Sequence, residues 1–517
     1  MGNASSVCSY PASCERWGLF EITLSGPAEG NPFTEQSVSA VFTGAGRSVS
    51  VRGFYDGNGL YRIRFMPSEE GPHTFRISAV FPVAEPEGFF TVTPASGNNH
   101  GPVRVKNTFH FAYEDGTAYY PVGTTCYVWE LQDDGLIRQT LGSLKVSGFN
   151  KIRFCIFPKH YLYNLHDPRS FPYEGTPVDC RLLNEDNFND FNGAAPGNSW
   201  DFTRFDPAHF RHIENCIVEL QQLGIEADII IMHPYDRWGF SCMTQEQNDL
   251  YWHYLTARLS AFRNIWWSLA NEYDLMPSMK TEDWERLAGI LCAEDPYGHL
   301  RSIHNCVPLY DYTRPWVTHC CIQRQDLYRT AEYTGEWRKQ FGKPVVLDEI
   351  AYEGDIPCGW GNITGEEMVR RFWEAAIRGG YPGHGETLPE GGNILWWSHG
   401  GQLRGESWKR VRFLRRILSE TPGIGLAPVR SEWDDVSAVP EDKRLAEETG
   451  CRIWYYSFMR PSSREFRFED DRARRVEIID TWNMTVQDAG VHTGHFRIPL
   501  PSRPYMAIRM RFEQTCR

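Results

Sequence analysis

Residues 264–276 read NIWWSLANEYDLM, an apolar run that ends abruptly in polar residues. The part from Ile265 to Ala270 has the length and composition of a buried β-strand. Asn271 and Glu272 follow directly, and a carboxylate is costly to bury unless it is paired or takes part in chemistry. This stretch therefore predicts a buried strand that delivers an acidic group to a functional site.

Similar apolar runs lie on both sides of this stretch, from about residue 118 to residue 400, and amphipathic helices separate them. Helices are expected at 207–224 and 365–380, among other places. Eight strands that alternate with helices predict an α/β fold, a (β/α)8 TIM barrel. A doubly wound open sheet fits the sequence less well than a barrel, because no glycine-rich phosphate loop follows the first strand. In chain order, the strand candidates are YYPVGTT, FNKIRFCIF, EADIIIMH, NIWWSLAN, LRSIHNC, WVTHCCIQ, PVVLDEI and NILWWSH.

The two ends of the chain have a different pattern. Residues 17–95 are short alternating segments separated by Gly, Pro and Asn, which is typical of a β-sandwich, and the chain is rich in strand-like segments again after about residue 423. We therefore predict an N-terminal sandwich at 1–100, a catalytic barrel at 101–422 and a C-terminal sandwich at 423–517. Unpaired edges of the sandwiches would allow a homo-oligomer.

Composition narrows the classes of function. The net charge is −13 and no basic stripe is visible, so no nucleic-acid partner is expected. We find no secretory signal and no run of 18 apolar residues, so we expect a cytoplasmic protein without a membrane partner. The 14 Cys are scattered without a CxxC pair, which fits buried thiols in a reducing compartment. The 18 Trp are mostly expected to fill the core, and they also offer flat apolar faces for a ligand.

The carboxyl ends of the strands form the mouth of such a barrel, where active sites lie. Glu272 ends the fourth strand and Glu349 ends the seventh. Two carboxyl groups that face each other across a pocket are what glycoside cleavage needs, because one donates a proton and the other attacks the sugar. Alternation in PVVLDEI puts Asp348 and Glu349 on opposite faces, so Asp348 stays open as the alternative to Glu349.

Several segments resemble a known family. GFNKIRF, SLANEYD and VVLDEIAYEG look like the second, fourth and seventh strands of the retaining glycoside hydrolase clan with a (β/α)8 barrel. The N-terminal segment CERWGLFEITLSG is similar to the domain called DUF5060, and VEIIDTWNMTV resembles DUF5605. The barrel segment MHPYDRWGF resembles the cellulase-like group DUF4038, which includes apiosidase-type enzymes.

This resemblance implies roles for individual residues. Glu272 would be the acid/base and Glu349 the nucleophile, with Asn271 near the sugar 2-hydroxyl and Arg153 beside the nucleophile. His319 and Trp397 would belong to the −1 subsite. The sixth strand, THCCIQ, lacks the tyrosine that is common in the clan after its histidine, so what positions the nucleophile is an open question.

Other polar and aromatic residues near strand ends are candidates for substrate binding. Alternative interpretations exist for some of them: His233 as a core histidine, residues 236–239 as a salt-bridged turn, and the glycines around His384 and Glu386 as simple turn residues in a loop over the pocket. The full set of further candidates is His160, His233, Asp236, Arg237, Trp238, Tyr352, His384 and Glu386.

The leading hypothesis is an exo-acting retaining glycosidase whose partner is a small oligosaccharide or glycoside, with no cofactor and no metal. A non-catalytic carbohydrate-binding protein is one alternative. A metal-dependent hydrolase that uses His233, His304 and His319 is another, although no HxH or HExxH spacing supports it. An inverting mechanism also stays open, because only the separation of the carboxyl groups distinguishes it from retention.

Overall fold

The computed structural model describes residues 7–191, 195–276, 278–390, 395–431 and 435–513. The chain forms two compact units, one of residues 1–103, 127–137 and 154–301, the other of residues 104–126, 138–153 and 302–517.

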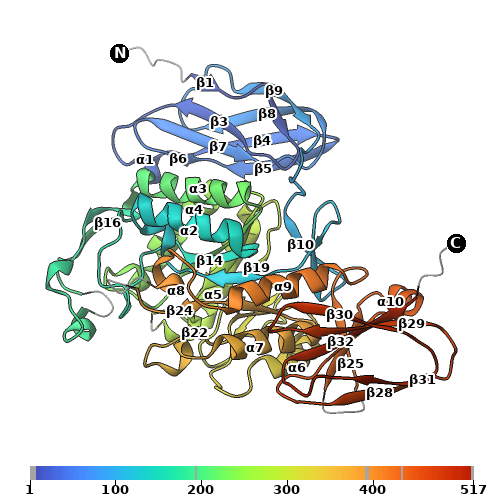
Figure 1. Cartoon of the computed structure of the whole chain (residues 1–517). Helices are drawn as coiled ribbons and strands as arrows, with labels where there is room; N and C mark the ends of the chain where they lie inside the picture. The colour runs from blue at the N-terminus through green and yellow to red at the C-terminus, as the bar shows by residue number, and fades with distance from the viewer. Residues whose placement is uncertain (1–6, 192–194, 277, 391–394, 432–434, 514–517) are drawn as a thin grey trace. The chain divides into compact units, whose positions relative to one another are not determined.

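The N-terminal strands form two facing sheets, with strand orders β1-β3-β7-β6 and β2-β9-β8-β4-β5 (Figure 1). Neighbouring strands are antiparallel except β2 and β9, which pair in parallel. Side chains alternate between core and solvent, as in β3, and the core is rich in phenylalanine, with Phe20 stacked on Phe90 at 3.7 Å between ring centroids. The elements are β1 (Cys8–Ser9), β2 (Ser13–Glu15), β3 (Phe20–Ser25), α1 (Pro32–Glu35), β4 (Val38–Gly44), β5 (Arg47–Arg52), β6 (Phe54–Tyr55), β7 (Leu60–Phe65), β8 (Gly71–Ala79) and β9 (Glu87–Thr93).

Eight strands form a nearly closed parallel barrel in the order β19-β18-β17-β14-β13-β23-β21-β20, which confirms the predicted fold. A parallel bridge between His304, just after β19, and Cys321 of β20 joins the two outer strands of this order. The strands are β13 (Gly123–Thr125), β14 (Lys151–Cys155), β17 (Glu226–Met232), β18 (Ile265–Ala270), β19 (Arg301–Ser302), β20 (Cys320–Gln323), β21 (Val345–Glu349) and β23 (Tyr381–His384).

The helices of the barrel begin and end where their sequences favour it. Helix α3 starts at Pro207, after Asp206, whose carboxylate accepts a hydrogen bond from the Ala208 amide at 2.8 Å. Helix α7 ends before Gly379, whose φ of 76° is in the left-handed region. The helices are α2 (Asp134–Ser147), α3 (Pro207–Gln222), α4 (Gln245–Leu259), α5 (Thr281–Glu294), α6 (Thr334–Phe341), α7 (Gly365–Ile377), α8 (Trp396–His399) and α9 (Ser407–Ser419).

The eighth strand differs from the prediction. We expected it in NILWWSH, but Trp396–His399 is the short helix α8, and Asn393 and Ile394 lie outside the described residues. The strand is instead β23, YPGH, which pairs in parallel with β13 and with β21. Its glycine has a steric reason, since a Cβ on Gly383 would lie 2.6 Å from the Asp348 carbonyl oxygen.

Short strand pairs accompany the barrel. A three-stranded sheet precedes β13, a hairpin of β15 and β16 follows β14, and β22 pairs with β24 after β21 and β23. These strands are β10 (Val103–Lys106), β11 (His110–Tyr113), β12 (Ala118–Tyr119), β15 (Tyr173–Thr176), β16 (Ser199–Phe205), β22 (Glu353–Gly354) and β24 (Glu386–Thr387).

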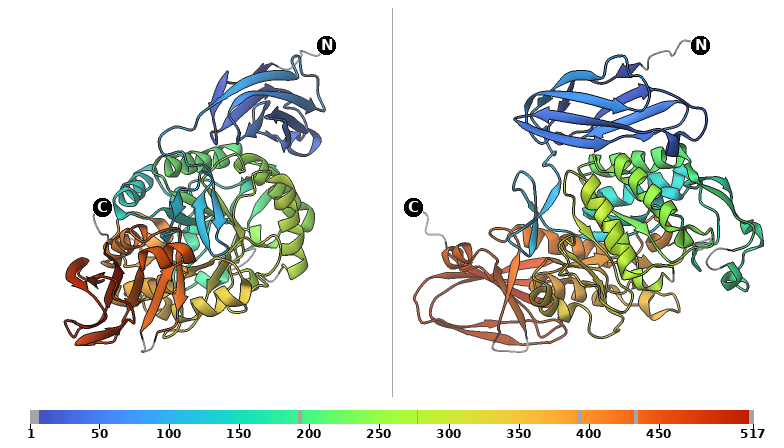
Figure 2. Two further views of the ribbon diagram at one scale, coloured as in Figure 1. Left: turned by 90° about the vertical axis from the view of Figure 1, so that its right-hand side faces the viewer. Right: turned by 180° about the vertical axis from the view of Figure 1, so that it is seen from behind.

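The C-terminal strands form a six-stranded sheet, β25-β26-β27-β32-β29-β30, and a two-stranded sheet, β28-β31 (Figure 2). Trp454, Phe466, Val476 and Ile508 lie in the core that these strands enclose. The elements are β25 (Leu426–Val429), β26 (Val436–Pro440), α10 (Lys443–Thr449), β27 (Arg452–Tyr455), β28 (Ser463–Arg467), β29 (Arg474–Asp480), β30 (Thr485–His492), β31 (His495–Pro499) and β32 (Met506–Phe512).

Candidate active site at the ends of the barrel strands

Glu272 lies where the chain leaves β18. The register of β17 and β18 pairs Met232 with Ala270, and the Asn271 amide donates to the Met232 carbonyl oxygen at 3.0 Å. Glu272 then adopts the left-handed conformation, with φ 50° and ψ 56°, which ends the strand. Non-glycine residues in this region concentrate at functional sites, where the surrounding structure holds them. The side chain is 6% exposed.

Polar neighbours hold the Glu272 carboxylate. The Tyr235 hydroxyl donates a hydrogen bond to Oε2, and Asn271 Nδ2 donates to the same oxygen at 3.4 Å. Asn271 is oriented in turn, because the Tyr127 hydroxyl donates to its Oδ1 at 3.4 Å. Tyr235 and Asn271 thus fix the orientation of one oxygen of the carboxylate.

Lys159, which follows β14, lies among three tyrosine rings. Its Nζ is 3.4 Å from the ring centroid of Tyr127, 4.3 Å from that of Tyr235 and 5.0 Å from that of Tyr161. Aromatic faces stabilise a buried ammonium group by cation–π attraction. Lys159, Tyr127 and Tyr235 are absent from the predicted set of site residues, because the sequence gives their place near strand ends but not their partners. The signal that could have revealed Tyr235 is its position just past His233 at the end of a buried strand.

Glu349 lies at the end of β21, beside two nitrogen-bearing side chains. Its Oε1 is 3.9 Å from Arg153 Nη1 and 3.4 Å from His304 Nε2. Arg153 and His304 are both buried, whereas Glu349 is partly exposed. The arrangement puts a permanent cation next to an accessible carboxylate.

A β-bulge in β21 explains how both acidic residues of this strand can turn inward. Cys321 pairs with Val346 and Gln323 with Glu349, so β21 has one residue more than β20 between these pairs. An extra residue bends a strand and re-aims the following side chain. Simple alternation, which treats Asp348 and Glu349 as exclusive choices, therefore does not apply here.

Asp348 is bound to internal partners. Lys151 Nζ donates to Oδ1 at 2.7 Å, and the Cys321 thiol donates to Oδ2 at 2.8 Å. Burial opposes ionisation, but the charges of Lys151 and Arg153 together with these hydrogen bonds hold the pKa of Asp348 well below its usual range. Cys321 Sγ also lies 3.2 Å from His304 Nδ1, which links Asp348 to the histidine beside Glu349.

Three aromatic residues gather after β21 and in α8. The ring centroids of Trp360 and Trp397 are 4.9 Å apart, and Tyr352 lies 6.1 Å from each of them. Tyr352 and Trp397 are buried, whereas Trp360 is half-buried. The structure thus brings two predicted residues together and adds Trp360, which the sequence did not single out.

Residues 236–241 make the contacts of a tight turn. The Asp236 carboxylate accepts hydrogen bonds from the amides of Trp238, Gly239 and Ser241 at 2.7, 3.2 and 2.8 Å. Burial raises the pKa of Asp236. Arg237 is paired with Asp167 at 2.6 Å, and Trp238 is buried against other aromatic rings. These contacts favour the alternative interpretation, a salt-bridged turn.

The predicted histidines occupy separate places. His233 is buried, and its Nε2 donates to the Phe157 carbonyl oxygen at 3.2 Å; burial lowers its pKa to about 3. His160 stacks on Phe188 at 4.2 Å between centroids, and burial lowers its pKa to about 4. The contacts of His233 are those of a core histidine.

His319 differs most from its predicted place. It directly precedes β20, whose other end is Gln323, so it lies at the amino end of its strand and not at the carboxyl end. Its ring contacts Phe111 of β11 at 5.9 Å between centroids, and burial lowers its pKa to about 3. This position does not support the −1 subsite role that the resemblance implied for His319.

His384 and Glu386 belong to β23 and β24 and not to a loop over the pocket. Within the described parts of the chain, they form with Glu353 the one group of histidine, cysteine and acidic side chains with a spacing that suits a metal ion. His233, His304 and His319 are not such a group there, which weighs against the metal-dependent hydrolase.

Comparison with known proteins gives the family. The profile of the apiosidase-like catalytic domain matches residues 106–417, the domain of unknown function DUF5060 matches residues 13–80, and DUF5605 matches residues 433–511. No curated protein sequence matches the chain.

Solved structures agree with this assignment. A Bacteroides vulgatus protein provisionally assigned as a glycoside hydrolase is 35% identical, with a TM-score of 0.88, over 97% of this chain and 100% of that one. A glycoside hydrolase family 5 protein of the same species is 16% identical, with a TM-score of 0.58, over 80% of this chain and 94% of that one, and shows the fold alone. The chain therefore belongs to the apiosidase-like family, whose catalytic domain it contains, and it is a glycosidase.

Proposed function

We propose that the protein cleaves a terminal glycosidic bond of a small oligosaccharide or glycoside with retention of configuration. Glu272 is the acid/base and Glu349 is the nucleophile. The observation that supports these roles is the difference in the contacts of the two carboxyl groups: Glu272 accepts hydrogen bonds from the Tyr235 hydroxyl and the Asn271 amide, whereas Glu349 lies beside the Arg153 guanidinium. An adjacent cation favours the anionic form that a nucleophilic carboxylate needs, and an acid/base group must be held in a fixed orientation toward the leaving oxygen.

The reaction has two steps. Glu349 attacks the anomeric carbon to form a glycosyl ester, while Glu272 gives its proton to the leaving oxygen. Glu272 then takes a proton from a water molecule, which attacks the same carbon and releases the sugar and the free Glu349 carboxylate. Asn271, which follows β18 and directly precedes Glu272, would bind the sugar 2-hydroxyl. Tyr352, Trp360 and Trp397 would provide apolar faces for the ring.

The experiment that tests this proposal combines kinetics with trapping. Wild type, Glu272→Gln and Glu349→Gln are assayed on aryl apiosides, glucosides, galactosides and arabinosides. Each variant should lose about 10³-fold or more in kcat, since acid/base and nucleophilic steps contribute on that scale. The exposed Glu282→Gln on α5 is the control and should keep full activity.

A 2-fluoro glycoside of the preferred sugar should label the peptide that contains Glu349, as mass spectrometry will show. The first product seen by NMR should have the anomeric configuration of the substrate. An inverted product, or a label on another residue, would refute the proposal. If wild type cleaves no sugar of the panel, but one sugar raises Tm equally in all three proteins, carbohydrate binding without catalysis is the better description.

We also infer a cytoplasmic location. The cysteines in the described ranges are free thiols, which is the usual state in reducing compartments. Among the described residues, no helix is long and apolar enough to cross a bilayer. Cell fractionation of the native host tests the location, and recovery of the protein outside the cytoplasmic fraction would contradict it.

A further inference from the structure

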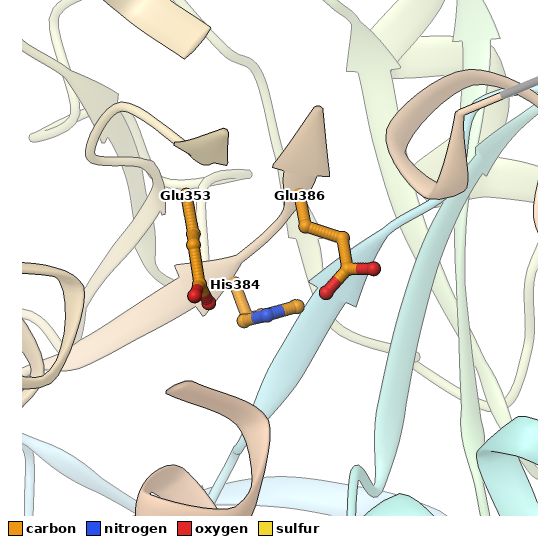
Figure 3. Close-up of side chains that lie close together, drawn as sticks. All are labelled: Glu353, His384 and Glu386. Carbon is orange, nitrogen blue, oxygen red and sulfur yellow. The ribbon is translucent and has the colours of Figure 1, made fainter. Parts of the chain in front are cut away.

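Three buried side chains meet where the segments that follow β21 and β23 pair with each other. Glu353 of β22 is the partner of Glu386 of β24, and His384 ends β23. One nitrogen of His384 and one oxygen of each carboxylate lie within 4.8 Å of one another. In Figure 3 the His384 imidazole lies between the two carboxylates. The side chains are buried, with Glu353, His384 and Glu386 only 6%, 0% and 1% exposed.

His384 has one nitrogen in use and one available. Its Nδ1 lies 3.0 Å from Thr124 Oγ1, and the same oxygen accepts a hydrogen bond from Trp396 Nε1 at 2.8 Å. Nε2 is buried and has no hydrogen-bond partner among the described residues. A hydrogen bond to the other ring nitrogen is what orients histidines that bind metals. If Nδ1 carries the proton that is donated to Thr124 Oγ1, Nε2 keeps a lone pair that faces the two carboxylates.

The two glutamates concentrate negative charge. Glu353 accepts hydrogen bonds from the amides of Glu406 and Ser407 at 2.8 and 3.0 Å, and Glu386 accepts one from the Gly405 amide at 2.9 Å. Glu353 Oε2 also accepts a hydrogen bond from the Ser407 hydroxyl, and Glu386 Oε1 accepts one from the Arg404 amide. These contacts orient the carboxylates, and Glu353 Oε1 and both oxygens of Glu386 keep a second lone pair for another partner.

Gly405 keeps side-chain atoms away from these carboxylates. A Cβ at this position would lie 2.5 Å from Glu353 Oε2 and 2.7 Å from Glu386 Oε2. Any larger residue would therefore push the two groups apart. A small polar site results. It consists of the backbone of residues 404–407, the side chains of Glu353 and Glu386, and the His384 imidazole.

We propose that Glu353, His384 and Glu386 bind one divalent transition-metal cation of the Zn²⁺ or Mn²⁺ type. One imidazole and two carboxylates are a mixed nitrogen and oxygen set that suits these ions, whereas Ca²⁺ and Mg²⁺ prefer oxygen ligands alone. The ion would join the segment after Glu349 and Tyr352 to the segment after β23. It would stabilise the positions of these segments and take no part in bond cleavage. This inference does not depend on the proposed hydrolysis.

Metal binding by the whole protein tests the inference directly. The protein is stripped with a chelator, equilibrated with Zn²⁺ or Mn²⁺, passed through a desalting column and analysed for metal content. We expect one ion per chain, a higher Tm than that of the stripped protein, and, with Co²⁺, the visible absorption of a buried nitrogen and oxygen site. None of these readouts requires a substrate, so failure here is distinguishable from failure of the proposed hydrolysis.

Variants locate the ion. His384→Phe keeps an aromatic ring against Phe149, whose centroid lies 4.7 Å from that of His384, and it should lose the metal, as should Glu386→Gln. Thr124→Val keeps all three ligands and removes the hydroxyl that orients His384 and that also accepts the Trp396 Nε1 hydrogen bond, so metal affinity should fall about 10- to 100-fold. Glu226→Gln, which changes another buried glutamate outside the cluster, is the matched control and should bind one ion.

Two results would overturn the inference. One is a metal content near zero in wild type together with no change in Tm, which would leave the carboxylates as simple acceptors for the amides before α9. The other is equal metal content in wild type, His384→Phe and Glu386→Gln, which would place the ion elsewhere. If a variant does not fold, the Co²⁺ spectrum of wild type and the affinity of Thr124→Val still decide the question.

Discussion

At the scale of single residues, Tyr235 is the contact that most directly affects the chemistry of Glu272. Its hydroxyl donates to the Glu272 carboxylate, and its ring lies 4.3 Å from the Lys159 ammonium. The sequence shows that Glu272 follows a buried strand, but it cannot show that a tyrosine from the neighbouring strand reaches it. This is why the two glutamates could be predicted from their positions and their partners could not.

Tyr235→Phe should lower kcat/KM about 10- to 100-fold, because a hydrogen bond to a charged group contributes about 1.5–3 kcal/mol. Steady-state kinetics on the preferred aryl glycoside measure the effect. Tyr161→Phe, in the same group of tyrosines around Lys159, is the control and should change kcat/KM less than threefold. Equal effects of the two substitutions would mean that the hydrogen bond to Glu272 has no special role.

Glu226 gives a prediction for pH. It begins β17, is 4% exposed, and accepts a hydrogen bond from Trp266 Nε1 at 3.1 Å. Burial raises its pKa to about 8. The unfolded chain loses this proton near pH 4.5, whereas the folded chain keeps it to about pH 8, so stability falls by about 1.4 kcal/mol per pH unit across that window.

Glu226→Gln removes this titration and can still accept the Trp266 hydrogen bond. Calorimetric Tm values at pH 5 and pH 8 check the prediction. The difference in Tm between the variant and wild type (variant minus wild type) should be clearly larger at pH 8 than at pH 5. A Tm difference that is the same at both pH values would show that Glu226 does not retain its proton in the folded protein.

At the scale of elements, β23 shows what limits prediction from sequence. Strands such as EADIIIMH are recognisable because they contain a continuous apolar run, here Ile229–Met232, as expected for a strand covered on both faces. YPGH contains a proline and a glycine and looks like a turn, while the apolar WWSH nearby is a helix. Glycine is required in β23 by the approach of the Asp348 backbone, which is a tertiary constraint with no local signal. His319 was misplaced for a related reason, since WVTHCCIQ reads as one strand although only Cys320–Gln323 is extended.

Gly383→Ala should destabilise the protein by about 1–3 kcal/mol, because the added Cβ overpacks the barrel against β21. Gly289→Ala is the matched control: this glycine is exposed in α5, and a Cβ there meets no atom within 4 Å. Alanine in the interior of a helix should stabilise by about 0.5–1 kcal/mol. Thermal unfolding of both variants measures the effects, and a loss of Tm in Gly289→Ala as large as that in Gly383→Ala would contradict the steric explanation.

At the scale of the whole molecule, a buried network of charges connects the N-terminal sandwich to helices α3 and α4. Arg64 of β7 pairs with Glu214 of α3 at 2.9 Å, and Arg258 of α4 pairs with Glu214 at 2.6 Å and with Asp56 at 2.8 Å. Burial raises the pKa of both carboxyl groups, but Arg258 and the other arginines outweigh it and lower the pKa of Asp56 and Glu214. Their contribution to stability is therefore present above about pH 4.5 and is lost as the pH falls further.

Arg258→Met should destabilise the protein by about 3–5 kcal/mol, because it leaves Asp56 and Glu214 buried with too little positive charge. Arg52→Met is the comparison, since Arg52 of β5 pairs with Glu294 of α5 at 3.0 Å but is 49% exposed. A pair of that kind contributes at most about 1 kcal/mol. Calorimetry at neutral pH measures both effects, and similar losses of Tm would mean that burial does not determine the strength of these pairs.

The same charge network limits how such a chain can arise or change by recombination of its modules. A sandwich grafted from another protein would have to supply counterparts of Asp56 and Arg64, or Glu214 and Arg258 of the barrel would be desolvated without their full set of opposite charges. Gene fusions that exchange only the first domain should therefore yield poorly folding products unless these four positions are inherited together. We therefore expect the sandwich and the first half of the barrel to be inherited together, although a linker separates them in the sequence.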